Sequence, residues 1–203
     1  MTSPAPKSKR QSILDAAKQA FLAHGYSNVS MEAIAEAAPV SKPTLYSHFK
    51  SKQDLFAAVV AGECEFLLGT LERSPSEFQD VVTGLHAIAR AVVDLIYAPE
   101  SLMLYRLIIA EQQHFPELGP QVYRSGAEPV LLQLSSYLSE LEAAGTLTIP
   151  DVAVSSRLFL SMLKGDEHFR CLLGVQSGLN DAEKEAMIDA AVSLFLKGHG
   201  YEA

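Results

Sequence analysis

The sequence contains no tryptophan, only two cysteines, and few aromatic residues, which make up 8% of the chain. Cys64 and Cys171 both fall inside apolar helical patterns, where a thiol is more often a buried structural residue than a reactive one. A redox pair is the alternative. Neither cysteine has a neighbour at zinc-ligand spacing, so the sequence predicts no metal site and no cofactor.

Long apolar runs are also missing. Stretches such as Ala87–Ile96 are short and are interrupted by Arg90 and Asp94, whereas a membrane-spanning helix needs about 20 apolar residues. The first ten residues end in basic side chains but have no apolar core behind them, which is unlike a secretory signal. We therefore expect a cytoplasmic protein without a membrane segment.

Alternation of apolar and polar residues, the pattern of a half-buried strand, is almost absent. Apolar residues instead recur at steps of three and four, which is typical of helices. The sequence predicts an all-α fold of about nine helices. We expect a helix to start at the capping sequence Ser74-Pro75-Ser-Glu77, and a long helix at about 118–143 to bend at Pro129. The last two helices are expected at about 151–174 and 181–197.

The charge is unevenly distributed along the chain. The net charge is −8, yet residues 1–52 carry seven Lys or Arg against three Asp or Glu, and the remaining 151 residues carry nine against 21. A basic N-terminal part can attract nucleic acid while the acidic remainder is repelled from it. The overall acidity therefore does not exclude DNA binding.

Two short helices follow a longer one near the N-terminus, an arrangement typical of DNA-binding units that present one helix to the major groove. On the third helix Leu45 and Phe49 are expected to face inward. The outward set is expected to be Lys42, Thr44, Tyr46, Ser47 and His48, with Lys50 and Lys52 beside the free N–H groups of the fourth helix. An ordinary three-helix packing unit with a polar surface is the alternative.

The spacing of this region over about 45 consecutive residues resembles the DNA-binding domain of the TetR/AcrR family. The matching residues are Ile13-Leu-x-Ala-Ala17, Phe21, Gly25-Tyr26, Ser30-Met31, Ile34-Ala35, Ala38-x-Val40-Ser41-Lys42-x-Thr44-Leu45-Tyr46-x-His48-Phe49-x-x-Lys52-x-x-Leu55-Phe56. The resemblance implies a helix-turn-helix domain at 1–50 and an effector-binding and dimerisation domain at 51–203.

The resemblance also implies roles for single residues. Ser30, Tyr46, His48 and Lys52 would hold phosphates, which supplies affinity and register rather than sequence choice. Lys42, Pro43 and Thr44 would read bases. The full predicted DNA-binding set is Ser30, Ser41, Lys42, Pro43, Thr44, Tyr46, His48, Lys50 and Lys52.

Two prolines depart from the family pattern. Pro39 stands where the family usually has glycine, and proline does not adopt a positive φ, so we expect the turn to close differently or to place the strain on Ala38. Pro43 stands where the family commonly has a small residue. In the first turn of a helix its missing N–H costs little, and its apolar ring suits a thymine methyl group.

The region from Arg106 to Gly174 resembles the effector domain of the AefR-like branch. The matching residues are Arg106-x-x-Ile-Ala-Glu111, Phe115-Pro-Glu-Leu118, Gly145-x-Leu147, Asp151 and Leu163-x-Gly165. This implies a ligand-binding helical bundle and a homodimer formed by the last two helices. The helix at 151–174 has apolar or small residues on nearly all sides, and the last helix adds further apolar residues. A helix that is apolar all round is either central in the fold or buried against a second chain, and we expect these two helices to form the dimer.

A ligand pocket would need polar groups among apolar ones. The candidates on or near inward-facing stripes are His86, Arg90, Tyr97, Met103, Arg106, Glu111, His114 and Phe169. Surface charges with buried stems and core histidines are the alternative interpretation of these residues.

Two other classes of function have weaker support in the sequence. Glu111-Gln-Gln-His114 is half of a carboxylate-bridged di-iron motif, but none of the other histidines has a glutamate three residues before it. No nucleophile elbow or glycine-rich phosphate loop appears. A scaffold bundle would leave the basic N-terminal part unexplained. The sequence thus predicts no enzyme, but a dimeric repressor that a small-molecule effector releases from a palindromic stretch of double-stranded DNA.

Overall fold

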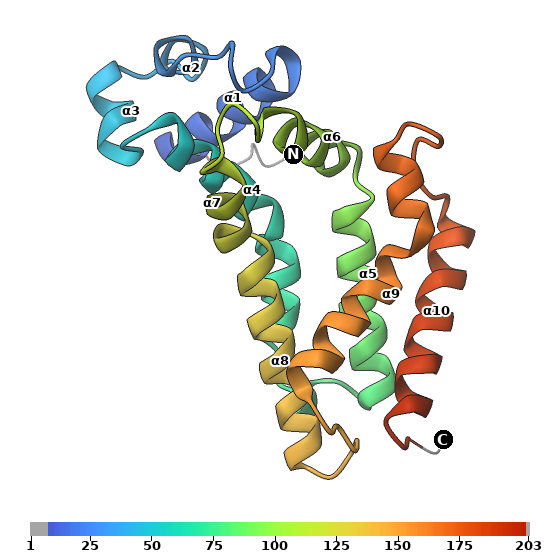
Figure 1. The fold of residues 1–203 in the computed structure, drawn as a ribbon. Helices are drawn as coiled ribbons and strands as arrows, with labels where there is room; N and C mark the ends of the chain where they lie inside the picture. Colours follow the sequence, from blue (N-terminus) through green and yellow to red (C-terminus); the bar gives the residue numbers. More distant parts are fainter. Residues whose placement is uncertain (1–7, 202–203) are drawn as a thin grey trace, which may run out of the picture. The chain divides into compact units, whose positions relative to one another are not determined.

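The computed structural model describes residues 8–201, apart from the side chain of Phe66. Throughout this part of the chain every regular element is a helix (Figure 1), which confirms the predicted all-α class. The elements are α1 (Lys9–His24), α2 (Met31–Ala37), α3 (Lys42–His48), α4 (Lys52–Leu71), a 3-10 turn η1 (Pro75–Glu77), α5 (Val81–Ile96), α6 (Pro99–Glu111), α7 (Leu118–Ser125), α8 (Ala127–Ala143), α9 (Val152–Leu172) and α10 (Asp181–Gly198).

The long helix expected at about 118–143 is two helices, so that prediction was wrong. α7 ends at Gly126, whose N–H bonds to the carbonyl of Val122 at 2.9 Å, and α8 starts at the next residue. Pro129 lies in the first turn of α8, where its missing N–H is no loss. Pro129 therefore lies at the start of α8 and does not bend a continuous helix.

The helix start predicted at Ser74 was also wrong in its extent. Ser74 and Glu77 do form a capping box, but they close only the turn η1. At Phe78 the backbone becomes extended. The Phe78 ring packs edge-on against the Tyr137 ring, with 6.2 Å between the two ring centroids. α5 starts three residues later, behind Asp80, whose carboxylate accepts a hydrogen bond from the Thr83 N–H at 2.7 Å.

The contacts divide the chain into two compact units. The N-terminal unit comprises Met1–Gly62 with Met103–Gly126, and the C-terminal unit comprises Glu63–Leu102 with Ala127–Ala203. α4 and α6 each contribute residues to both. The core of the N-terminal unit centres on the rings of Phe21, Tyr26 and Phe56, whose centroids lie 5.1–5.6 Å apart. This aromatic cluster joins α1, the α1–α2 loop and α4.

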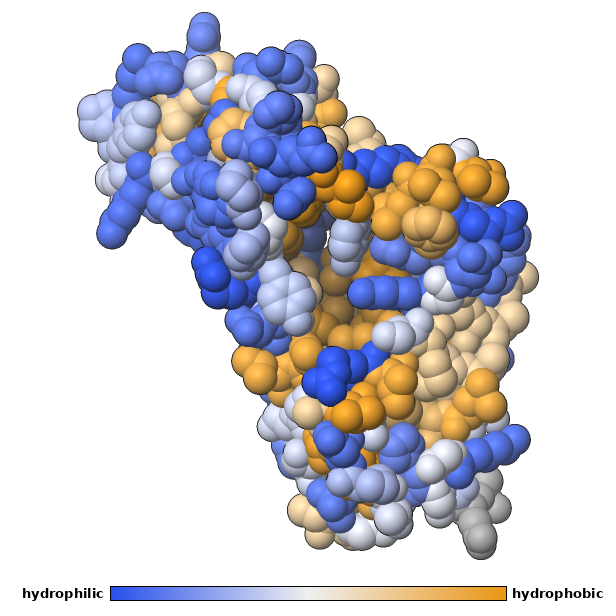
Figure 2. Space-filling view, viewed as in Figure 1, coloured by the Kyte–Doolittle hydropathy of each residue, from blue (hydrophilic) through white to orange (hydrophobic). Residues whose placement is uncertain are grey.

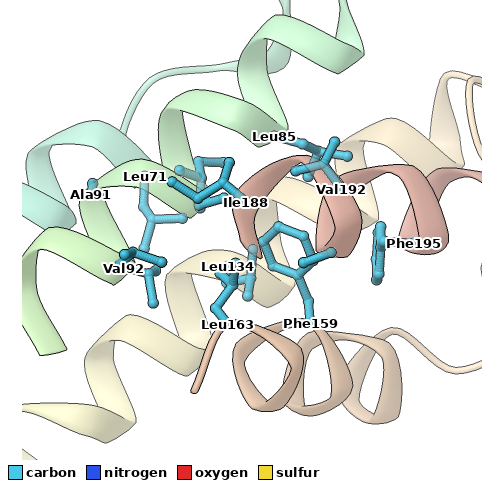
Figure 3. Packing of buried hydrophobic residues seen from close by; sticks show 14 of the residues in the cluster. Leu71, Leu85, Ala91, Val92, Leu134, Phe159, Leu163, Ile188, Val192 and Phe195 are labelled. Atoms are coloured by element: carbon cyan, nitrogen blue, oxygen red, sulfur yellow. The ribbon is translucent and has the colours of Figure 1, made fainter. Parts of the chain in front are cut away.

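The core of the C-terminal unit is drawn in Figure 3, where side chains from α4, α5, α8, α9 and α10 point toward one another. α5 packs on both α9 and α10, and α8 packs on α9. Leu85, Leu134, Phe159 and Val192 are fully buried there. Both cysteines are also buried in this unit, as predicted, and burial raises the pKa of the Cys64 thiol to about 11.

α9 is interrupted at Gly165, where φ is 58° and ψ is −169°. Only glycine adopts this backbone conformation readily, because a Cβ atom would clash. The Tyr97 hydroxyl donates a hydrogen bond to the carbonyl of Lys164, the residue just before the break. α9 is therefore two helical segments joined by a kink that Tyr97 helps to hold.

Within residues 8–201 no single helix is long and apolar enough to cross a membrane, and only the bent pair α5 and α6 passes such a test on length and composition together.

Gly84, in the middle of α5, faces a buried hydroxyl. A Cβ atom added at Gly84 would lie 2.2 Å from Tyr137 Oη and 3.2 Å from the Phe78 ring. Tyr137 is 2% exposed, and its hydroxyl has no hydrogen-bond partner among the described residues. The glycine thus makes room for an oxygen that contributes no bond.

We predict that Gly84→Ala destabilises the protein, by about 1–3 kcal/mol for overpacking, although alanine normally stabilises a helix interior. Tyr137→Phe removes the oxygen that the new methyl group would meet. The double variant Gly84→Ala/Tyr137→Phe should therefore regain most of the loss in urea unfolding experiments. If Gly84→Ala alone unfolds at the same urea concentration as the parent, the methyl group does not meet the tyrosine.

The turn between α2 and α3 contains a strained proline. The Val40 N–H bonds to the Ala35 carbonyl at 3.0 Å, as in a Schellman motif, which places Pro39 at the position usually taken by glycine. Pro39 has a φ of 21°, while Ala38 has a φ of −88° and a ψ of 11°. The expectation that proline would avoid a positive φ here was wrong. The strain falls on Pro39 itself, because the Schellman geometry requires it at that position.

Pro39→Gly should stabilise the protein by about 1–3 kcal/mol, the usual cost of such backbone strain. Glycine accepts the positive φ, and its N–H can bond to the Glu36 carbonyl, which proline cannot do. Thermal unfolding would measure the gain. Pro43→Gly is the matched control and should give none, because Pro43 lies in the first turn of α3, where proline fits.

Candidate nucleic-acid interface

α3 is a seven-residue helix whose start is specified by its own sequence. Ser41 has an extended backbone, and its side chain accepts a hydrogen bond from the Thr44 N–H at 3.3 Å. Pro43 adds a φ suited to the first turn. α2 begins in the same way, with the Ser30 side chain accepting from the Ala33 N–H at 3.1 Å. The start of each of these two helices is thus fixed by a serine N-cap.

The buried side of α3 fixes which residues face outward. Leu45 is fully buried and Phe49, just after the helix, is 4% exposed. Their burial leaves the other side of α3 in solvent: Lys42, Pro43, Tyr46, Ser47 and His48 are exposed, and Thr44 is partly exposed. Tyr46 is 45% exposed, although it is a large aromatic residue.

The cations of this region differ in how firmly they are held. Lys42 Nζ lies 3.5 Å from a Glu32 carboxylate oxygen, with both side chains about half exposed. Such surface pairs are worth about 0–1 kcal/mol, so a phosphate can replace Glu32 at little cost. Lys50 is exposed after α3.

Lys52 is held differently. At the start of α4, its ammonium group donates to the backbone carbonyls of Tyr26 at 2.9 Å, Val29 at 3.0 Å and Ser27 at 3.4 Å. The Nζ atom also lies 4.4 Å from the centroid of the Tyr26 ring. Burial lowers the pKa of Lys52, and the nearby carboxylate of Glu111 partly offsets this. An ammonium group has three donors, and here three carbonyls receive them.

Glu111, at the end of α6, contacts the same loop. Its carboxylate accepts hydrogen bonds from the Ser27 N–H, at 3.0 Å, and from the Ser27 hydroxyl. These bonds hold the pKa of Glu111 below its usual value. The sequence had placed Glu111 among the pocket candidates, whereas the structure turns it to the α1–α2 loop of the N-terminal unit.

Two other pocket candidates, on α5, are engaged with α10. Arg90 forms an ion pair with Glu185, and His86 Nε2 lies 3.1 Å from an Asp189 carboxylate oxygen. Lys184 and Asp94 add a third such pair at 2.8 Å. Together these polar contacts join the outer edges of α5 and α10 within the C-terminal unit.

The remaining pocket candidates are divided between the two units. Tyr97 is buried, with its hydroxyl directed to the kink in α9, while Phe169 is 59% exposed. Met103, Arg106 and His114 are exposed residues of the N-terminal unit. Among the described residues, no three His, Cys, Asp or Glu side chains come together as a metal site.

Two open hollows lie elsewhere, and none of the eight candidates lines either. One, of about 600 Å³, lies in the N-terminal unit between α1 and the turn at Pro39. The other, of about 550 Å³, lies in the C-terminal unit between the second half of α9 and α10, beside Gly165 and Met187.

Sequence reasoning missed the contacts of Lys52 and Glu111 with the α1–α2 loop. They join residues far apart in the chain, and a carbonyl acceptor leaves no mark on the identity of the residue that carries it. One signal in the sequence was Gly25, a glycine at a helix end, because the backbone groups that follow a helix must find partners outside it.

Comparison with known families agrees with this geometry. Residues 13–59 match the family model described as bacterial regulatory proteins, tetR family. Residues 83–201 match the model described as the C-terminal domain of AefR-like transcriptional repressors. The second match alone covers more than half of the chain.

The chain is also similar in sequence to individual regulators. The chain is 26% identical over 161 residues to the regulator UidR of Escherichia coli K12, covering 77% of this chain and 78% of that one. It is 35% identical over 114 residues to the transcriptional activator FasR of Mycolicibacterium smegmatis, covering 56% and 50%.

Solved structures give the same result. A protein described as a TetR-family transcriptional regulator from Mesorhizobium loti superposes with a TM-score of 0.79 at 32% identity, covering 95% of this chain and 96% of the other. The flavonoid-responsive regulator FrrA superposes with a TM-score of 0.73 at 34% identity, covering 94% and 96%.

The structure and the comparisons indicate the same family. The chain has a capped helix with an exposed polar face and a helical C-terminal unit, and its relatives are regulators and not enzymes. The chain belongs to the tetR family of bacterial regulatory proteins and is a DNA-binding transcription regulator with an AefR-like C-terminal domain.

Proposed function

We propose that this protein is a dimeric repressor that binds a near-palindromic operator and is released from it by a small-molecule effector. Residues 1–50 would bind DNA, and residues 51–203 would bind the effector and form the dimer. Because its target would be the operator DNA, we expect the protein to act in the cytoplasm.

The exposed face of α3 is the observation that carries the proposal. Buried Leu45 and Phe49 hold the helix by one side, and the major groove is wide enough to admit the other. Tyr46, His48 and Lys50 would hold phosphates, and Lys42, Pro43 and Thr44 would read base edges. The side chains of Ser30 and Ser41 already cap α2 and α3. We therefore expect the DNA backbone to lie near these two serines, at the N-termini of the two helices.

The proposed dimer rests on exposed apolar residues in the C-terminal unit. Leu158 on α9 is 56% exposed and Leu194 on α10 is 64% exposed. Phe169, Leu173 and Val175 are similarly exposed where α9 ends, and Figure 2 shows apolar surface over this end of the unit. Exposed apolar surface of this kind marks interaction sites. A two-fold dimer would present two α3 helices to successive major grooves, about 34 Å apart.

The proposed effector response draws on relatives. FrrA is described as flavonoid-responsive, and the matching C-terminal model is that of repressors. FasR is described as an activator, so relatives of this chain differ in the direction of their regulation. The effector can shift DNA binding only by its difference in affinity for the two states of the protein.

Fluorescence anisotropy with the DNA upstream of the protein's own gene tests DNA binding. We expect log Kobs to fall linearly with log salt concentration, because phosphate contacts release counterions. Tyr46→Ala should weaken binding to all sequences alike, by about 1.5–3 kcal/mol if its hydroxyl bonds to a phosphate. Substitutions of Thr44 should instead change the sequence preference.

Tyr123→Ala is the matched control, since Tyr123 is an equally exposed tyrosine on α7, outside the proposed interface. It should bind as the parent does. Affinity that does not respond to salt, or a Tyr46→Ala variant as tight as the parent, would contradict the assigned contacts.

The dimer has its own test. Leu158→Glu/Leu194→Glu would bring like charges together across the two-fold axis, which costs several kcal/mol, so the dimer dissociation constant should rise by about a hundredfold or more. Sedimentation measures it. Leu132→Glu, at a residue of α8 that is 65% exposed, is the control and should leave the dimer intact. A monomeric parent protein would refute this part of the proposal.

A further inference from the structure

The α1–α2 loop, residues 25–30, decides where α2 begins. It starts at Gly25, with its positive φ, and ends at Ser30, the N-cap of α2. Within the loop the Val29 N–H reaches the Tyr26 carbonyl only at 3.4 Å, and the Asn28 amide bonds back to the His24 carbonyl at 3.0 Å. A loop with so few internal bonds takes its position from what touches it.

Two charged residues from distant parts of the chain form hydrogen bonds with different groups of this loop. Lys52, from α4, donates to three of its carbonyls. Glu111, from α6, accepts from the N–H and hydroxyl of Ser27. The cation thus meets the loop's acceptors and the anion meets its donors, and Phe115 completes the arrangement with its ring 5.0 Å from that of Tyr26 and 5.9 Å from Lys52 Nζ.

We propose that Lys52 and Glu111 form an electrostatic brace on the α1–α2 loop that positions α2 for DNA, and that Lys52 contributes to operator binding as a positioning residue and not by neutralising a phosphate. This proposal rests on the proposed DNA-binding function. It replaces the phosphate role that the family resemblance implies for Lys52, because the three donors of its ammonium group are already used inside the protein. Without the brace, ordering α2 on the operator would cost affinity.

The effect of removing the Glu111 charge on DNA affinity distinguishes the brace from a general charge effect. Removing a negative charge from a protein that binds DNA normally strengthens binding or leaves it unchanged, through the general field of the protein. The brace predicts the opposite, because Glu111→Gln loosens the loop that leads to Ser30. Glu36, an exposed acid on α2, provides the comparison.

The experiment measures operator affinity of the full-length protein over a range of salt concentrations, with Lys52→Met and Lys50→Met as a matched pair. Methionine keeps the apolar stem over the Tyr26 ring and removes the charge. Lys52→Met should bind roughly tenfold more weakly with the salt slope of the parent. Lys50→Met should reduce the slope by about 0.9 for each phosphate that is no longer neutralised.

Glu111→Gln should also weaken binding with an unchanged slope, whereas Glu36→Gln should not weaken it. The double variant Lys52→Met/Glu111→Gln should lose little more than the worse single variant, because both changes release the same loop. Where Lys52→Met unfolds at the assay temperature, Ser27→Ala takes its place, since it removes one exposed hydroxyl and should lower affinity at constant slope.

A Lys52→Met variant whose salt slope falls as far as that of Lys50→Met would overturn the brace and return Lys52 to the phosphate contacts, with the proposed function intact. Tighter binding by Glu111→Gln would overturn it as well. Failure of the parent protein to bind any duplex at low salt would instead reject the proposed function on which the brace depends.

Discussion

The proposed recognition helix is only seven residues long, and a peptide of that length does not stay helical in water, because helix nucleation is unfavourable. α3 therefore depends on being held. Leu45 supplies a fully buried contact, Phe49 seals the C-terminal end, and Ser41 satisfies an otherwise free N–H at the start. The exposed polar face exists because the opposite face is buried in a core that α3 does not itself provide.

That core is aromatic and depends on segments remote in sequence. Phe21 of α1, Tyr26 of the loop and Phe56 of α4 pack together, and Phe115 reaches Tyr26 from the segment after α6. The rings of Tyr26 and Phe115 also lie against the ammonium group of Lys52, whose charge is offset by carbonyl dipoles and by Glu111. A lysine half-buried among rings thus becomes part of the packing, while Lys42 and Lys50 on the surface keep their charge available to a partner.

The C-terminal unit handles its polar groups in another way. Arg90, His86 and Asp94 on α5 pair with acids and a lysine on α10 at the solvent edge, and the core between these helices is mostly apolar. At the kink in α9, a buried tyrosine hydroxyl satisfies a backbone carbonyl next to a break in the helix. α4 and α6 each contribute residues to both units.

The family, the all-α class and the two faces of α3 could be read from the sequence, because capping residues and apolar spacing act over three or four positions and leave a direct mark on residue identity. The division of 118–143 into two helices and the short turn at Ser74 could not. The Phe78 ring packs against Tyr137, which is remote in sequence, and Gly126 by itself does not show that a helix ends there. Tertiary structure alone decided that Glu111 turns to Ser27, that Pro39 accepts a positive φ, and that Lys52 binds carbonyls. Each of these depends on groups brought together from distant parts of the chain, and a backbone carbonyl, which every residue carries, cannot be recognised as a partner until folding has placed it.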